Sequence, residues 1–238
     1  MSAVLTSMLL GAASTPGGNG MLTSLVGYWK LDGDATDASG NGLNGTATSV
    51  SWVSAIINQG ASFSGSANVD LTGNAALKTQ QMSVAGWFKW GAFTTDNRAA
   101  SDWHQSASLD RWLVYDNGTG VVDGYMNTAA NGVTFSQKGP VSFGTLSTGT
   151  WYHLALTYDG SIIKSYRNGA NIGTLDTSAS SGTTLRVSTG STLRLGKQAE
   201  TGPGSSLIID EFGYWSAALS GAQVSALYNS GAGLAYPF

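Results

Sequence analysis

The sequence predicts an all-β fold, in which antiparallel strands form a β-sandwich with a short helix near the C-terminus. Two observations support this prediction. Asn-Gly and Asp-Gly pairs occur nine times, and such pairs tolerate the positive φ angles of tight hairpin turns. Between these pairs lie short β-prone runs with no long helical pattern, which is typical of sandwiches and barrels.

The first twenty residues predict an N-terminal arm and linker, followed by one sandwich domain over residues 21–238. The arm is apolar at 8–13 and turns into a Pro-Gly-Gly linker. No Lys or Arg precedes Lys30, so the positive segment of a secretory signal is missing. We expect residues 1–20 to anchor the chain to a partner, and the competing interpretation is a frayed terminus.

Six strands are expected in the body of the chain. Each is a short run of β-branched and aromatic residues bounded by turn signals, and 83–90 also alternates in polarity. The expected strands cover residues 83–90, 112–115, 151–158, 161–167, 192–195 and 207–215.

One helix is expected at residues 222–228. Ser220 and Gln223 have the spacing of a capping box, and Leu219 and Val224 that of a hydrophobic staple. Gly231 is the expected left-handed residue after the helix.

The composition excludes several function classes. Only 11% of residues are charged and the net charge is −3, with Lys and Arg scattered singly, so no nucleic-acid surface is expected. Cysteine is absent, which removes disulfides and thiolate metal sites. No apolar run approaches the ~18–20 residues of a membrane span.

Four groups of motifs occur in an order that resembles the laminin-G-like, concanavalin A-like lectin/glucanase superfamily. The first group contains the pattern Asp-x-Ser-Gly-Asn-Gly from Asp37 to Gly42. The four groups cover residues 27–33 with 37–42, 82–88, 151–160 with 166–169, and 207–215 with 218–220. The resemblance implies a jelly-roll of two antiparallel sheets.

The same resemblance allows several functions, because a fold shared this widely does not fix an activity. Such domains also occur in phage particles. The leading hypothesis is a non-enzymatic virion protein, a phage capsid decoration or host-attachment protein, which binds virion proteins through residues 1–20 and self-associates at the virion surface. The alternatives are a secreted or cell-surface carbohydrate-binding module, and a glycoside hydrolase or lyase.

Catalysis is not expected from the motifs present. The chain has no His-Glu-x-x-His, Gly-x-Ser-x-Gly or phosphate-loop pattern. A glycosidase needs two carboxylates facing each other across a cleft. The only glutamates are Glu200 and Glu211, and neighbouring residues of a regular strand, such as Asp210 and Glu211, point to opposite faces.

A polar-aromatic segment is the candidate ligand-binding site. Trp faces stack on sugar rings, and nearby His, Arg and Asp side chains can bond the hydroxyls. The candidate residues are Trp103, His104, Arg111 and Trp112, with a glycan as the expected ligand. The competing interpretation is that Trp112 lies in the core and Trp103 covers a sheet edge.

A calcium ion is the candidate cofactor, because related domains often hold Ca²⁺ through oxygen ligands at the sandwich edge. The resemblance assigns it to Asp32 and Asp210, with Asp34 and Asp37 as further ligands. The competing interpretation is that these aspartates bond the backbone of their own turns.

The remaining aromatic residues and His153 are expected to be structural. Trp29, Trp87, Trp151 and Trp215 lie inside the strand motifs and are predicted to be core residues. His153 lies in the same kind of motif and is predicted to be a hydrogen-bonded framework residue.

Overall fold

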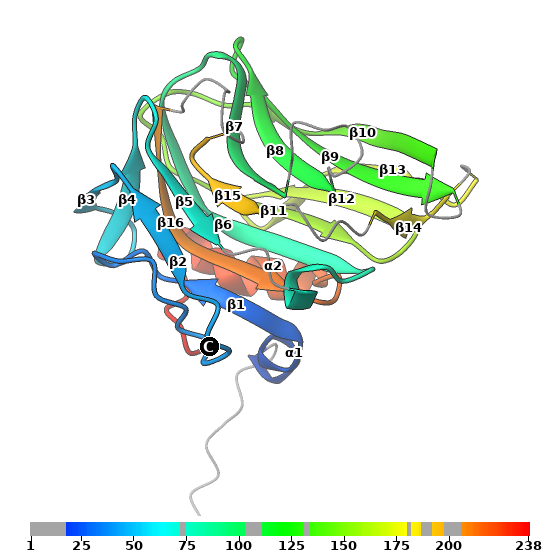
Figure 1. Cartoon of the computed structure of the whole chain (residues 1–238), viewed down its shortest axis with the longest axis horizontal. Helices are drawn as coiled ribbons and strands as arrows, with labels where there is room; N and C mark the ends of the chain where they lie inside the picture. The colour runs from blue at the N-terminus through cyan, green and yellow to red at the C-terminus, as the bar shows by residue number, and fades with distance from the viewer. Residues whose placement is uncertain are drawn as a thin grey trace, which may run out of the picture.

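The protein is a sandwich of two antiparallel β-sheets, which confirms the fold class predicted from the sequence (Figure 1). This computed structural model describes residues 18–71, 75–102, 111–130, 134–179, 182–186, 192–197 and 206–238. Neighbouring strands pair antiparallel throughout these residues.

Sheet A carries the C-terminal strand at its centre. In spatial order it contains β13 (Ala170–Asp176), β12 (Ile162–Arg167), β11 (Tyr152–Tyr158), β6 (Met82–Ala92), β16 (Ser206–Trp215), β4 (Gln59–Phe63) and β3 (Ser51–Ser54), while β1 (Leu25–Trp29) also pairs with β16.

Sheet B forms the other layer. In spatial order it contains β10 (Thr134–Thr145), β9 (Val121–Ala130), β8 (Trp112–Asn117), β7 (Thr95–Asp102), β15 (Leu193–Leu195), β5 (Asn68–Leu71) and β2 (Gly45–Thr48), while β14 (Thr184–Leu185) pairs with β9.

The main hydrophobic core fills the space between the two sheets. Sheet A contributes Trp90 and Phe212, and sheet B contributes Trp112 and Met126, all fully buried in one cluster. Because strand side chains alternate between faces, these inward residues also fix which residues point outward.

All six predicted strands are present, as β6, β8, β11, β12, β15 and β16. The turn predicted at Asn168-Gly169 joins β12 to β13, and both residues have positive φ. The turn predicted at Asp123-Gly124 is wrong, because both residues lie inside β9. A Cβ on Gly124 would come 2.7 Å from a methyl carbon of Leu156, so this glycine permits close packing of the two sheets.

The predicted C-terminal helix is α2 (Gly221–Tyr228), which a short 3₁₀ turn, η2 (Asn229–Gly231), follows. Its capping box is confirmed: Ser220 Oγ accepts from the Gln223 backbone, and Gln223 Oε1 accepts from the Ser220 backbone. The left-handed residue that ends α2 is Asn229 (φ 47°), not Gly231, because asparagine also tolerates this conformation.

The outer face of sheet A carries a second hydrophobic cluster. Val224 and Leu227 of α2 pack there with Trp215, and the C-terminal residues Tyr236 and Phe238 lie against the same cluster. This packing covers part of the sheet A outer face and leaves the outer face of sheet B as the other large surface of the sandwich.

The N-terminal helix α1 (Gly18–Ser24) crosses the boundary predicted at residue 20. Its Met21 is buried in the second cluster, so residues from Met21 onward are part of the sandwich unit. A second short 3₁₀ helix, η1 (Ala75–Leu77), lies between β5 and β6. None of the helices in the described ranges has the length and apolar character to cross a membrane.

Candidate functional site

Two of the four predicted ligand residues, Trp103 and His104, lie outside the described residues. The other two, Arg111 and Trp112, have no side-chain surface exposed to solvent. Trp112 packs in the core between the sheets, as the competing interpretation expected. In this conformation neither residue can contact a ligand that arrives from solvent.

Arg111 instead holds together segments that are distant in the sequence. Its Nη1 donates to the Leu77 carbonyl (2.6 Å) and to Asp102 Oδ2 (3.2 Å), and its Nε donates to the Arg186 carbonyl (2.7 Å). Lys78 Nζ donates to the same carboxylate at 2.8 Å. A buried charge is stable only when it is paired and hydrogen-bonded, which explains why Arg111 and Asp102 occur together.

The outer face of sheet B presents an aromatic and polar surface, which we call the tyrosine face. Trp112 and Val114 point into the core, so Tyr115 points outward from β8. Val122 and Met126 likewise point inward from β9, so that strand presents alternate residues to the outside. The tyrosine face comprises the partly exposed Tyr115 and Tyr125 and, beside them on the same side of the sheet, the buried Arg98, Ser101, Asp123 and Asn127.

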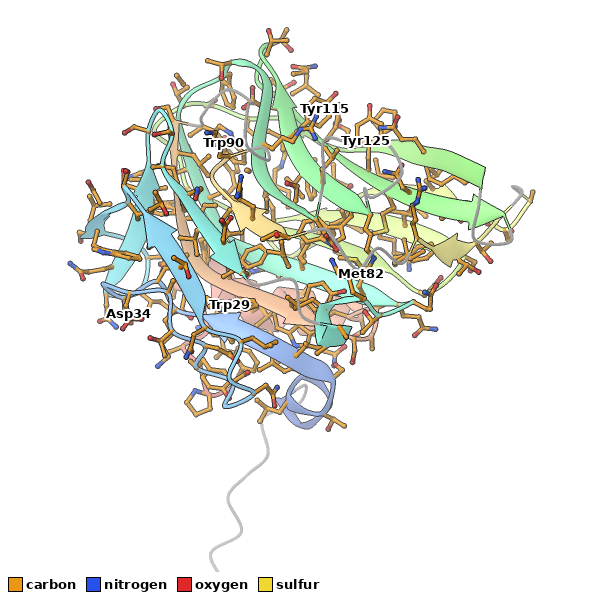
Figure 2. The ribbon with its side chains drawn as sticks, viewed as in Figure 1. Trp29, Asp34, Met82, Trp90, Tyr115 and Tyr125 are labelled. Carbon is orange, nitrogen blue, oxygen red and sulfur yellow. The ribbon has the colours of Figure 1, made fainter. Side chains whose placement is uncertain are left out.

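Two tyrosine rings form the centre of this face (Figure 2). The ring centroids of Tyr115 and Tyr125 are 5.5 Å apart with planes inclined at 47°, and both side chains are partly exposed. Burial, followed by the interaction with Tyr115, raises the pKa of Tyr125, so its hydroxyl stays protonated in neutral solution. The pair offers an apolar ring surface beside neutral hydroxyls.

Charged and amide groups surround the tyrosines. In the β-ladder Tyr115 lies directly between Arg98 of β7 and Asp123 of β9, so all three share one face. Ser101 and Asn127 are fully buried, and Ser101 Oγ and both amide atoms of Asn127 have no hydrogen-bond partner. Buried polar atoms without a hydrogen-bond partner are rare in folded proteins, and these atoms could bond to a polar partner.

The aspartates predicted to bind calcium brace one turn. Asp32 accepts from the Gln59 backbone (2.9 Å) and from Asn58 Nδ2, and Asp210 Oδ2 accepts from the Ile57 backbone (2.9 Å). Residues 57–59 follow the tip of the β3–β4 hairpin. Both carboxylates therefore hold this hairpin against the centre of the sandwich.

The other two aspartates bond the backbone of their own loop, as the competing interpretation expected. Asp37 accepts from Tyr28, Ser39 and Leu43, and Asp34 accepts from Thr36. Across the described ranges, no three His, Cys, Asp or Glu side chains converge in a way that could hold a metal ion. Ca²⁺ takes six to eight oxygen ligands. Of the Asp210 carboxylate, Oδ1 has no hydrogen-bond partner. The calcium ion stays a prediction; a melting temperature raised by Ca²⁺ and lowered by chelator would support it.

Asp210 and Glu211 do not point to opposite faces, so that expectation is wrong. The register of β16 against β6 shifts between Asp210 and Gly213, and Glu211 has φ 52°. This β-bulge gives β16 an extra residue opposite Gly86, which turns both carboxylates toward the outer face of sheet A. The side chains are only 0% and 5% exposed, so the pair is not open to a solvent-borne substrate.

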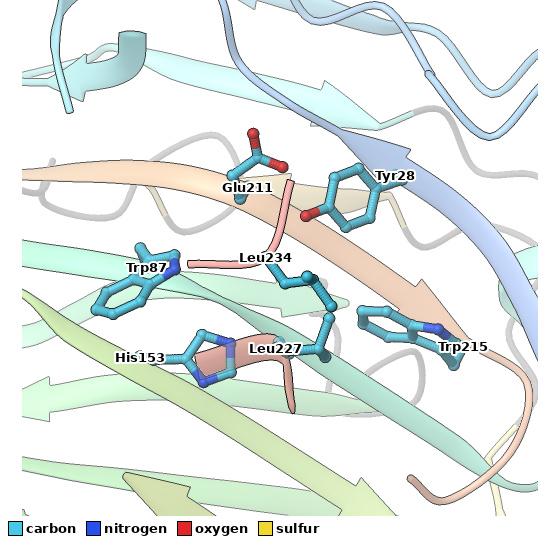
Figure 3. A pocket seen from close by; sticks show the side chains of 8 residues that line it. Tyr28, Trp87, His153, Glu211, Trp215, Leu227 and Leu234 are labelled. Carbon is cyan, nitrogen blue, oxygen red and sulfur yellow. The ribbon is translucent and has the colours of Figure 1, made fainter. Parts of the chain in front are cut away.

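Glu211 faces a small cavity under the C-terminal segment (Figure 3). Tyr28, His153 and Trp215 line it with Glu211, while Leu227 and Leu234 cover it. The cavity holds about 10 Å³, room for a single water molecule. Burial raises the pKa of Glu211 to about 7 and that of Asp210 to about 8, and it lowers the pKa of His153 to about 3.

The predicted structural residues mostly lie where expected. Trp29, Trp87 and Trp215 are buried, and so is His153, although its Nδ1 has no hydrogen-bond partner. Trp151 is the exception, because it precedes β11 and remains partly exposed. The tyrosine face was missed in the sequence because Tyr115 and Tyr125 belong to different strands, and only the β8–β9 register brings them together.

The fold agrees with a comparison to known families. A family model described as the concanavalin A-like lectin/glucanases superfamily matches residues 63–225. The chain belongs to this superfamily, as its motifs indicated. No curated protein sequence matches the chain.

Solved structures with the same fold include carbohydrate-related and toxin domains. Domain 4 of AbnA, a GH43 extracellular arabinanase from Geobacillus stearothermophilus solved with arabinotriose, is 21% identical, with a TM-score of 0.66 over 85% of this chain and 97% of that one. The binding domain of Paraclostridial Mosquitocidal Protein 1 is 15% identical, with a TM-score of 0.68 over 88% of this chain and 53% of that one.

A third similar structure is that of botulinum neurotoxin type C, whose cell entry is described as dependent upon interaction with two ganglioside molecules. It is 14% identical, with a TM-score of 0.65 over 89% of this chain and 52% of that one. The chain thus spans about half the length of these two toxin chains. At these identities the similarity establishes the fold.

Proposed function

We propose that this chain is a non-enzymatic, lectin-like domain that binds a glycan on the tyrosine face. The observation that carries the proposal is the partly exposed Tyr115–Tyr125 pair, in which Tyr115 lies between the buried Arg98 and Asp123. Aromatic rings stack on the apolar C–H face of a sugar, and the tyrosine hydroxyls can donate to and accept from its hydroxyls. Family membership and the neighbours that bind arabinotriose or gangliosides support this reading.

The experiment is a glycan array with the whole chain, followed by calorimetry with the strongest binder. Tyr115→Ala is expected to weaken binding about tenfold, because removing a stacking ring costs about 1.4 kcal/mol. Ile172→Ala, which trims an exposed apolar side chain on sheet A, is the control and should leave the affinity unchanged. Equal affinities of wild type and Tyr115→Ala would remove the tyrosine face from the proposal.

Within this function, the finer assignment we put forward is a phage virion protein at the virion surface. It would be a capsid decoration or host-attachment protein, with residues 1–20 binding other virion proteins and the chain forming homo-oligomers. The uncharged N-terminal sequence supports this assignment. The alternative is a secreted or cell-surface carbohydrate-binding module, and the size in solution with and without residues 1–17 separates them: the module predicts a monomer in both cases.

The non-enzymatic part of the proposal is supported by the burial of the acid pair. A glycosidase needs two carboxylates beside its substrate, whereas Asp210 is buried beside the β3–β4 hairpin and Glu211 is buried under the C-terminal segment. Hydrolysis of the bound glycan by the purified protein would contradict this part alone.

A further inference from the structure

A second candidate binding site lies on the opposite sheet from the tyrosine face. The outer face of sheet A contains a cleft of about 240 Å³ where β4, β6 and β16 run side by side. We call it the Lys89 cleft. The residues that line it include Ser62, Ser64, Lys89 and Ser206.

The register of the strands explains why Lys89 and Ser62 point to the outer face. Lys89 pairs with Ile208, and Ile208 pairs with Ser62, so the three residues form one row across the sheet. Their neighbours Phe63, Trp90 and Leu207 belong to the core between the sheets. Alternation therefore turns Lys89, Ile208 and Ser62 outward.

The cleft is open because the C-terminal helix stops short of this row. Tyr228, the last residue of α2, contacts the ring of Trp87 at 5.7 Å between centroids. Lys89 is the next outward residue along β6, two positions beyond Trp87. The helix thus covers the sheet up to Trp87 and leaves the Lys89 row partly exposed.

The charge of the cleft is positive and uncompensated. The ammonium of Lys89 lies 5.0 Å from the ring centroid of Trp151, a cation–π contact, and no carboxylate of the described chain lies within ion-pair distance of it. No acidic side chain is among the described residues that line the cleft. An anion would supply the partner that the ammonium lacks.

The other lining groups match a small polyhydroxylated molecule. Three serine hydroxyls can both donate and accept hydrogen bonds, and Ile208 adds apolar surface. The volume lies just below the ~300–1,000 Å³ of pockets for drug-sized ligands, which suits a single ring. A Cβ on Gly91 would come 2.7 Å from Ser206 Oγ, so glycine at this position keeps the serine hydroxyl unobstructed.

We propose that the Lys89 cleft binds one negatively charged sugar residue, with the carboxylate on Lys89 and the hydroxyls on the serines. The domain would then hold two ligands on opposite faces of the sandwich. The two sites share no side chain, so this inference does not depend on the tyrosine face.

The test compares two sugars that differ only at C6, where glucuronate carries a carboxylate and glucose a hydroxymethyl group. Calorimetry or NMR titration of the whole chain with glucuronate and with glucose should give at least tenfold tighter binding of glucuronate, because a hydrogen bond to a charged group is worth about 1.5–3 kcal/mol. Added NaCl should weaken the glucuronate binding. Equal affinities for the two sugars would overturn the proposal.

Variants locate the binding. Lys89→Met should lose the preference for glucuronate, and Lys89→Arg, which retains the charge, should keep it within a few-fold. Lys164→Met removes an outward lysine elsewhere on sheet A and serves as the matched control. Tyr115→Ala should leave glucuronate binding unchanged, so failure of this site and failure of the tyrosine face are distinguishable. A Lys89→Met protein that is folded by thermal melting yet binds glucuronate like wild type would contradict the assignment.

Discussion

The carboxylates of Asp210 and Glu211 share one face of sheet A because a single residue of β16 has a left-handed backbone conformation. Both are buried, and both have carboxylate oxygens without a hydrogen-bond partner. Burial has the largest effect on the pKa of Glu211 and raises it. The Tyr28 hydroxyl and the positive charge of Lys30 lower this pKa, whereas the negative charge of Asp32 raises it. His153 faces the same cavity and burial keeps it neutral. Protonation of the two acids therefore favours the folded state.

Stability should fall as the pH rises. The unfolded Asp210 carboxyl loses its proton near its ordinary pKa of 3.8, whereas the folded one keeps it up to about 8. Its contribution is fully present below the unfolded pKa and is lost as the pH rises through the folded pKa. We expect the free energy of unfolding to drop by a few kcal/mol between about pH 4 and pH 8, measured by denaturant titration.

Asp210→Asn tests the origin of this pH dependence. The amide oxygen can still accept from the Ile57 backbone, but it carries no titrating proton. The variant should show a flatter pH profile and a higher stability than wild type at pH 8. Asp34→Asn, at an exposed position, is the control. A wild-type slope retained in Asp210→Asn would assign the effect to other groups.

At the scale of elements, helix α2 depends on its first turn. It is only eight residues long, and short helices are marginal without capping and packing. Ser220 satisfies the Gln223 backbone N–H, and Gln223 returns a bond to the Ser220 backbone. This reciprocal cap was visible in the sequence because it depends on residues only three positions apart.

Ser220→Ala should lower the free energy of unfolding by about 1 kcal/mol, because one backbone donor loses its partner. Chemical denaturation measures the change. Ser225→Ala, at an exposed position within the same helix, is the control and should be neutral or slightly stabilising, since alanine is the better helix former. A loss equal in both variants would show that the cap has no special role.

At the scale of the whole molecule, the two ends of the described chain meet on the outer face of sheet A. Tyr28 of β1 stacks on Tyr236 with ring centroids 5.0 Å apart, and the ring of Phe238 lies 5.4 Å from Tyr28. These aromatic contacts complete the second hydrophobic cluster. They hold the C-terminal segment, which contains Leu234, against the Glu211 cavity. The C-terminal residues are therefore part of the folded unit.

Removing residues 234–238 should lower the free energy of unfolding by roughly 3 kcal/mol or more, because several aromatic contacts are lost together. Urea denaturation measures this loss. Ile172→Ala, on the exposed surface of β13, should stay within about 0.5 kcal/mol of wild type. If the truncated chain is as stable as wild type, the C-terminal segment is not needed to close the sandwich.

The sequence by itself determined the fold class, six strands and the helix cap. Turn dipeptides, strand periodicity and capping boxes depend on residues that are close together in the chain, so they can be recognised in the sequence alone. The burial of Trp29, Trp87 and Trp215 followed from the same patterns.

Only the tertiary structure decided which residues form a surface. Tyr115 meets Tyr125, and Lys89 and Ser62 lie in one row on either side of Ile208, because ladder register places separate strands side by side. The bulge at Glu211 reverses the expected orientation of a carboxylate, and a change of one residue in register moves every later side chain to the other face. In the sequence Arg111 had the features of a ligand-binding residue. In the structure it donates to the carbonyls of Leu77 and Arg186, which are distant in the chain, and so it is a structural residue.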